Sequence, residues 1–359
     1  MRFSIFDGIR GHLLIGMLVA HLGFSEGLGA LLMFHHQKIL RLYDAEFFVT
    51  IAGLLIGVLV ARKAGDPGYF NSFVRRRLGT IYRYYLASAV PVLLLTVFPH
   101  GQFAGMTTLA ETLFGIVTLQ QGGGYSDILP IYFYSFLVLG ILYPIGKRFG
   151  HLAMGLASAC LYGVSQVYLS KGMLGLSDGF VVFNVAAWQF LFVVSFLIGL
   201  NSRSVLGWLK GLSNWQGLIL FAICVAIFAL SRVVLPDTFE LYNGQYSGNG
   251  LRMHLHPLYL IAIVSVVVGF SLVLANPPRI LMPVHAILVW YFSLGFLQTV
   301  GRYSIQMFVL HVYMMALFRQ LAPSLTAQGD MVLAIMMIVA FILAPVSYEA
   351  LKARRSSVA

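Results

Sequence analysis

Two ionisable residues, Arg10 and His21, lie in the first apolar segment of the chain. In an α-helix their spacing of eleven residues is about 20° from three full turns, so both side chains lie on one face. They are about 16 Å apart along the axis of such a helix. An imidazole exchanges protons near neutral pH, and a guanidinium binds phosphate or carboxylate groups. The pair therefore predicts acid–base chemistry and anion binding in one interior. The alternative is an interfacial arginine with a hydrogen-bonded core histidine.

A carboxylate, Glu46, enters the second apolar segment at the depth predicted for His21. A buried carboxylate that faces an imidazole fixes its tautomer and raises its basicity, as in nucleophile–base–orienter sites. The alternative is a carboxylate solvated at the outer headgroups, and we expect Asp44 to have that position. His21 and Glu46 are thus predicted to act together.

Basic residues gather at the start of the third apolar segment, at Arg75, Arg76, Arg77 and Arg83. Such a cluster is typical of a cytoplasmic anchor under the positive-inside rule. Arg83 lies one to two helical turns deeper in the membrane than the other three arginines, so a role as a cytoplasmic anchor explains its position less well. With Arg10 it could bind the phosphates of a cytoplasmic, nucleotide-like donor such as coenzyme A.

The composition indicates a membrane protein that holds these residues on helices. Hydrophobic residues make up 59% of the chain, charged residues make up 10%, and the mean hydropathy is +0.87. Soluble domains carry about a quarter charged residues. A bilayer span needs about 20 apolar residues in helical conformation. The sequence predicts an all-α polytopic bundle with ten spans, near 8–24, 42–62, 79–98, 128–147, 150–170, 184–201, 215–235, 257–275, 303–320 and 331–350.

The positions of the lysines and arginines predict the topology. The basic residues between spans fall on one side only if the short apolar stretches 106–120 and 286–300 do not cross the membrane. Both termini are then cytoplasmic, and Lys38 and Arg41 lie outside. The net charge of +11 is explained by topology and lipid headgroups, so we expect no nucleic-acid partner.

The remaining features predict no separate domain and no metal site. The connections between spans are short, no internal repeat is apparent, and we expect a single domain over residues 1–359. The first apolar run begins with Asp7 and Arg10 and lacks a small-residue cleavage site, which argues against a cleaved signal. Cys160 and Cys224 have no metal-binding spacing and are expected to pack in the core. The histidines other than His21 and His311 are expected to be structural or at the surface.

Several of these residues form motifs that resemble the acyltransferase-3 superfamily of membrane acyltransferases. Arg10 and His21 resemble its first-span signature, and the stretch from Glu46 to Gly53 is similar to its acidic–FFVLSG segment. The stretch from Val300 through Ser304 to His311 resembles its late helix. Within the superfamily, segments 127–132 and 184–192 resemble the OpgC family, which succinylates osmoregulated periplasmic glucans.

This resemblance implies an enzyme of the bacterial inner membrane with a succinyl-CoA or other acyl-CoA donor, a glucan acceptor and His21 as catalytic base. It implies no permanently bound cofactor. The donor would be bound by Arg10, Arg76, Arg77 and Arg83, and residues that bind the acceptor or support the site would be Asp44, Asp127, Trp188, Gln189 and His311. The sequence departs from the superfamily pattern at two places. The Arg-x-x-Arg motif of the superfamily is not clean at Arg76 and Arg77. Ala52 replaces the serine that is usual in the acidic–FFVLSG segment.

The functional hypothesis is transfer of an acyl group, expected to be succinyl, from a cytoplasmic thioester to a periplasmic glucan hydroxyl. His21 acts as general base and Glu46 orients it; a covalent acyl-His21 intermediate is an alternative to direct transfer. Another alternative is an O-acetyltransferase of a different surface polysaccharide. A proton-coupled transporter using Arg10, His21 and Glu46 is a further alternative, against which the missing repeats count. An inert scaffold poorly explains buried ionisable residues on converging faces.

Overall fold

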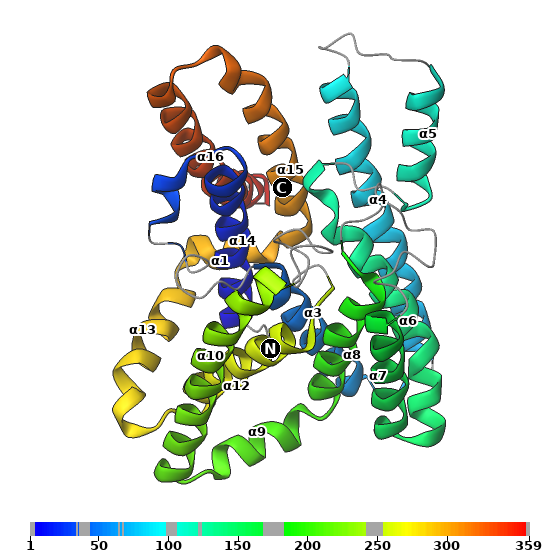
Figure 1. The fold of residues 1–359 in the computed structure, drawn as a ribbon, viewed down its shortest axis with the longest axis vertical. Coiled ribbons are helices and arrows are strands. Elements are labelled where there is room, and N and C mark those ends of the chain that lie inside the picture. Colours follow the sequence, from blue (N-terminus) through cyan, green and yellow to red (C-terminus); the bar gives the residue numbers. More distant parts are fainter. Residues whose placement is uncertain are drawn as a thin grey trace. The chain divides into compact units, whose positions relative to one another are not determined.

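The protein is helical throughout the described part of the chain (Figure 1). The computed structural model describes residues 4–33, 35, 44–63, 65–66, 68–97, 106–120, 124–167, 183–241 and 254–356. Within these ranges it has fourteen α-helices and no strand, which confirms the predicted all-α class. Lys38, Arg41, His36 and His100 lie outside the described residues.

Eight of the described helices are long and apolar enough to cross a membrane, so the chain is a multi-pass membrane protein. The number rises to ten if each of two bent pairs is one span. These ten include the stretch 286–300, predicted not to cross, and do not include the predicted span 150–170. One pair is α8 (Val185–Leu200) with α9 (Ser202–Gly211), bent by 75°. The other is Arg279–Phe292, which contains α13 (Met282–Phe292), with α14 (Gly295–Arg302), bent by 61°.

The two short apolar stretches have different structures. The stretch 106–120 forms α5 (Met106–Val117), which has 12 residues and is too short to span, as predicted. The stretch 286–300 lies on the bent pair of α13 and α14, which could form one span. The predicted span 150–170 is α7 (His151–Val167), a helix of 17 residues. The predicted cytoplasmic location of both termini stays a prediction.

The chain forms two compact units, and each is described by itself. Unit 1 consists of Met1–Phe48, Thr80–Pro130 and Trp290–Ala359, and unit 2 of Val49–Gly79 and Ile131–Val289. The unit boundaries fall inside α3 (Asp44–Arg62), α4 (Tyr69–Val97), α6 (Ile128–Phe149) and α13. The single domain predicted for residues 1–359 stays a prediction.

Glycines in unit 1 let helix α1 (Ser4–Ala20) pack backbone to backbone against α14. A Cβ atom on Gly11 would lie 2.0 Å from the carbonyl oxygen of Leu297, and one on Gly301 would lie 1.8 Å from that of Asp7. Neither distance leaves room for any side chain. This small-residue packing is characteristic of helices that associate in membranes. Unit 1 also contains α15 (Ser304–Leu321) and α16 (Ala327–Ser356).

The end of α1 is irregular, because its last α-helical residue, Ala20, is followed by a π-helical turn over His21–Ser25. π-Helical turns are rare and frequently occur at functional sites, since the wider turn changes the direction of the side chains that follow. His21 is the first residue of this turn.

In unit 2, α7 packs against α8, and α10 (Asn214–Leu241) and α12 (Pro257–Ala275) lie alongside each other (Figure 1). A Cβ atom on Gly57 of α3 would lie 2.1 Å from the carbonyl oxygen of Phe196, so α3 and α8 also meet at a glycine. Gln189 is buried and accepts a hydrogen bond of 2.8 Å from Ser158 of α7. Its amide also donates to the Ser158 carbonyl at 3.1 Å, which links α7 to α8.

Candidate active site

Two histidines from opposite ends of the chain meet in unit 1. Nδ1 of His21 lies 2.7 Å from Nε2 of His311, within hydrogen-bond distance, and the ring centroids are 4.8 Å apart. His311 comes from the middle of α15 and is fully buried, whereas His21 is partly exposed. The structure therefore brings together the two histidines that the sequence placed in separate motifs.

Tyr125 covers the His21 ring. It belongs to the short 3₁₀-helix Gly124–Ser126, directly before α6. Its ring stacks on the imidazole of His21, with centroids 4.2 Å apart and an interplanar angle of 28°. Stacking of this kind restricts rotation of the imidazole, so Tyr125 helps to hold His21 in one orientation.

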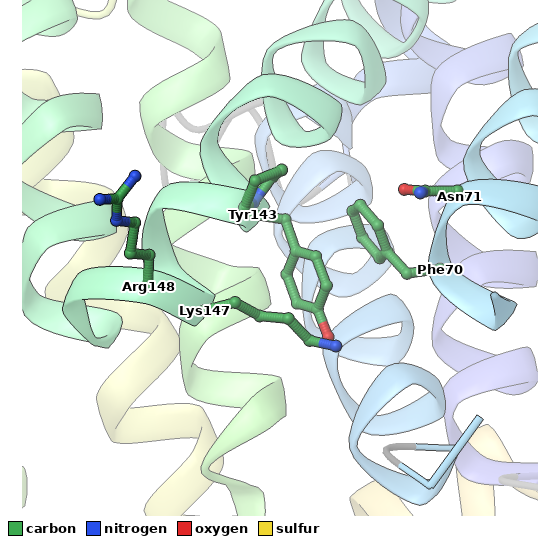
Figure 2. Close-up of a pocket in the computed structure, with 6 residues that line it drawn as sticks. Phe70, Asn71, Tyr143, Lys147 and Arg148 are labelled. Carbon is green, nitrogen blue, oxygen red and sulfur yellow. The ribbon is translucent and has the colours of Figure 1, made fainter. Parts of the chain in front are cut away.

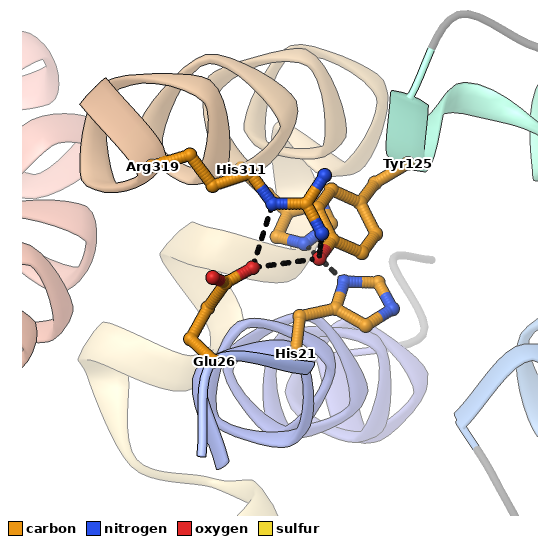
Figure 3. Close-up of polar contacts among 5 residues, drawn as sticks. All are labelled: His21, Glu26, Tyr125, His311 and Arg319. Carbon is orange, nitrogen blue, oxygen red and sulfur yellow. Dashed lines mark hydrogen bonds and ion pairs between the residues drawn. The ribbon is translucent and has the colours of Figure 1, made fainter. Parts of the chain in front are cut away.

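Glu26 and Arg319 extend this cluster (Figure 3). Nε of Arg319 donates to Oε1 of Glu26 at 2.7 Å, and the Tyr125 hydroxyl donates to the same oxygen at 3.0 Å. Nη2 of Arg319 donates to the Tyr125 hydroxyl at 2.7 Å. Glu26 follows the π-helical turn and Arg319 lies in the last turn of α15. The network therefore ties the segment after His21 to the helix that carries His311.

The tautomers of the two histidines decide which nitrogen of His21 can accept a proton. With the His311 proton on Nδ1, its Nε2 accepts from Nδ1–H of His21, and Nε2 of His21 carries a lone pair. Figure 3 shows the second ring nitrogen of His21 pointing away from the other four residues. This tautomer is suited to a general base.

The carboxylates of α3 are both buried, and this corrects the prediction for Asp44. Asp44 is 1% exposed and Glu46 is 0% exposed, so Asp44 is not a solvated headgroup carboxylate. A Cβ atom on Gly16 of α1 would lie 2.7 Å from Oδ1 of Asp44 and 3.1 Å from Nε2 of His35. Protein packing, rather than lipid headgroups, thus surrounds Asp44. The predicted role of Glu46 as the orienter of His21 stays a prediction.

The predicted donor-binding arginines lie in different environments. Arg10 forms an ion pair of 3.8 Å with Asp7, one turn earlier on α1, and is about one-quarter exposed. Arg83 of α4 is exposed and, like Arg10, belongs to unit 1. Arg76 and Arg77 are exposed on the part of α4 that belongs to unit 2, where the Arg77 guanidinium lies 5.4 Å from the Phe73 ring centroid. Their role in phosphate binding stays a prediction.

The other predicted site residues divide between the two units. Asp127 lies two residues after Tyr125, and burial raises its pKa to about 7, so the carboxyl is partly protonated at neutral pH. Trp188 and Gln189 are fully buried in the core of unit 2. The Gln189 amide is satisfied by Ser158, which is the pattern of a structural polar residue.

Unit 2 also has a pocket of about 330 Å³ between the start of α4 and the end of α6 (Figure 2). The Phe70 and Tyr143 rings stack there, with centroids 3.7 Å apart. Nζ of Lys147 lies 5.6 Å from the Tyr143 ring centroid, and Arg148 also lines the pocket. Aromatic faces with two cations are suited to a phosphate-bearing ligand. Sequence reasoning assigned these cations only a topological role.

Three site residues escaped the sequence argument: Glu26, Tyr125 and Arg319. Glu26 is one of only 12 acidic residues, and a carboxylate five residues after a candidate base was a usable signal. Arg319 lies eight residues after His311, close to the same helical face. Nothing local marks Tyr125. In the described part of the chain, no group of three or more His, Cys, Asp or Glu side chains could hold a metal ion.

Fold and site together define a multi-pass, all-α membrane protein with a paired-histidine acid–base site. The family described as OpgC protein matches residues 2–355, nearly the whole chain, and the protein belongs to this family. Membership suggests an acyltransferase role in glucan modification. No curated protein and no solved structure is detectably similar to the chain.

Proposed function

We propose that the protein is an O-succinyltransferase of the bacterial inner membrane, which moves a succinyl group from a cytoplasmic coenzyme A thioester to a hydroxyl of a periplasmic glucan. The observation that carries the proposal is the hydrogen bond of 2.7 Å between His21 and His311. It supplies an imidazole held in place by a buried partner, an arrangement that suits general-base catalysis. Family membership supports the choice of acyl transfer.

In the proposed reaction, Nε2 of His21 removes the proton from a glucan hydroxyl. The hydroxyl oxygen forms a bond with the thioester carbonyl carbon, and the carbon–sulfur bond then breaks. The coenzyme A thiolate leaves and takes the proton from His21, so the products are the succinyl ester and free coenzyme A. General-base help of this kind contributes about 10²–10⁴-fold.

His311 orients the base by accepting from Nδ1–H of His21, a role that the sequence hypothesis gave to Glu46. As His21 takes a proton it becomes an imidazolium, which a nearby neutral acceptor stabilises less than a carboxylate does. We therefore keep Glu46, which is fully buried, as a proposed source of negative charge for the imidazolium. The two roles are compatible, because orientation and charge stabilisation are different contributions.

We propose that cations bind the donor phosphates at the cytoplasmic side. Arg10, Arg76, Arg77 and Arg83 are the predicted residues, and the pocket with Lys147 and Arg148 supports phosphate binding in unit 2. In proteoliposomes, Arg83→Ala should raise the KM for donor supplied on the cytoplasmic face and leave the KM for glucan nearly unchanged. Equal activity with donor supplied on the periplasmic face would contradict the cytoplasmic assignment.

The function itself is tested by mass spectrometry of periplasmic glucans from cells with and without the protein. Succinyl esters should disappear in the deletion strain, return with the wild-type chain and stay absent with His21→Ala. Loss of acetyl esters instead would identify the protein as an O-acetyltransferase. Unchanged glucans in the deletion strain would refute the proposal. Full activity of purified His21→Ala would refute the assignment of the base.

A further inference from the structure

Within the part of the chain that the structure describes, Arg319 has hydrogen-bond donors without a partner near the paired histidines. A guanidinium has five N–H groups, and the bonds to Glu26 and Tyr125 use one on Nε and one on Nη2. The remaining three lie on Nη1 and Nη2. The Arg319 side chain is 50% exposed.

Tyr125 places this cation within reach of the proposed chemistry. The Arg319 Cζ atom lies 4.9 Å from the Tyr125 ring centroid, which is 4.2 Å from the His21 ring centroid, so Cζ lies within about 9 Å of His21. In a four-carbon dicarboxylic acyl chain, three bonds of about 1.5 Å separate the thioester carbonyl from the distal carboxylate, a span of about 4 Å. A hydrogen bond of about 2.9 Å from the distal carboxylate to the guanidinium places the thioester carbonyl about 7 Å from the bonded nitrogen. This reach is comparable with the distance of up to about 9 Å between Cζ and the His21 ring.

Glu26 orients the Arg319 guanidinium without using all of its hydrogen-bond donors. Its side chain is 15% exposed, and its Oε1 accepts from both Arg319 and Tyr125, which holds the plane of the guanidinium in one orientation. Arginine binds carboxylates through two parallel N–H groups, and the Nη edge can accept a second carboxylate after the Nε edge is taken. The preorganised plane lowers the entropy cost of that second contact.

We propose that Arg319 binds the distal carboxylate of the acyl group, so that the site selects an anionic acyl thioester over a neutral one of equal length. This inference rests on the proposed acyltransferase function and names a residue that determines its substrate class. The competing interpretation is that the ion pair of Arg319 and Glu26 only fastens α15 to the segment after His21.

The test compares succinyl-CoA with butyryl-CoA, which has the same number of carbons and no charge on the acyl chain. kcat/KM for each donor is measured with purified protein in proteoliposomes and a glucan acceptor. A charge-assisted hydrogen bond contributes about 1.5–3 kcal/mol, so Arg319→Gln should lower the preference for succinyl about 10- to 100-fold. Butyryl transfer should change little. Arg319→Lys keeps the charge without the fork and should retain part of the preference.

Two further variants separate recognition from fastening. Glu26→Gln breaks the same ion pair but keeps the cation, so the preference for succinyl should survive. Arg302→Gln is the matched control, because Arg302 forms a comparable exposed ion pair of 2.9 Å with Glu349 in the same unit. It should leave the preference unchanged.

The inference is wrong if Arg319→Gln slows both donors equally, or if the wild-type protein does not prefer succinyl-CoA. Equal slowing of both donors in Arg319→Gln and in Glu26→Gln, with the preference unchanged, would likewise show that the ion pair only fastens the helix. If the wild-type protein transfers neither acyl group, the proposed function fails, and this inference fails with it.

Discussion

Replacement of His311 by alanine tests the paired-histidine site most directly. The change removes the partner of Nδ1 of His21, which lies 2.7 Å away and is fully buried. Because His21 is partly exposed, loss of this hydrogen bond costs about 0.5–1.5 kcal/mol, which corresponds to about 2- to 13-fold in kcat if the cost falls on the transition state. The KM values for donor and glucan should change little, because His311 orients the base rather than binding either substrate.

The comparison with other variants identifies the mechanism of the loss. His311→Gln retains an acceptor oxygen near the position of Nε2 and should recover most of the lost kcat. His21→Ala removes the base and should lose about 10²–10⁴-fold. The double variant should be no worse than His21→Ala, because residues that act as a unit are not additive.

The assay is transfer of labelled succinyl from succinyl-CoA to glucan in proteoliposomes, with thermal unfolding as the check on folding. His12→Gln is the matched control, since His12 also lies on α1 and forms a hydrogen bond of 2.9 Å with the Tyr291 hydroxyl. Its kcat should stay near the wild-type value. A wild-type kcat in His311→Ala, or an additive loss in the double variant, would refute the coupling of the two histidines.

Four other substitutions probe the carboxylates and the packing. Glu46→Gln should lower kcat while the Tm stays near the wild-type value. Asp44→Asn, at a site that is 1% exposed, should lower the Tm more than kcat. Equal effects of the two substitutions on kcat would refute the special role of Glu46. Burial raises the pKa of Asp127 to about 7. The cost of ionising this carboxyl in the folded state is therefore absent below the ordinary pKa, grows as the pH rises to about 7, and is complete above pH 7. Asp127→Asn should therefore raise the Tm at pH 8.5 and have little effect near pH 4; the opposite pH trend would contradict this. Gly301→Ala should cost about 1–3 kcal/mol by overpacking and also lower kcat, and a wild-type Tm would show that α1 and α14 do not meet as described.

Hydropathy predicted the helical fold because each span is a local property of about 20 residues. It did not predict how helices end or bend, since the π-helical turn at His21 and the 75° bend between α8 and α9 depend on tertiary packing. The prediction for Asp44 was wrong for a related reason. A carboxylate at the start of an apolar segment can be covered by lipid headgroups or by protein, and the sequence does not distinguish the two.

The site was predicted residue by residue but not as a cluster. His21 and His311 both belong to recognisable motifs, yet 290 positions separate them, so their hydrogen bond exists only in the folded chain. Glu26, Tyr125 and Arg319 meet through contacts of similarly long range, and no local sequence pattern specifies which partners they contact.

Helix packing explains why the late motif has a glycine at Gly301, and the same packing relates Gly301 to His311. A Cβ atom on Gly301 would lie 2.8 Å from the backbone nitrogen of Gly11, so the two glycines mark one point of closest approach between α14 and α1. Gly11 precedes His21 by ten residues, and Gly301 precedes His311 by ten residues. Each histidine therefore lies the same number of residues after the contact between Gly11 and Gly301. A side chain at either glycine would separate the helices at that point, and α1 would transmit the displacement toward His21. The motif thus requires glycine for the geometry of a site that glycine does not itself touch.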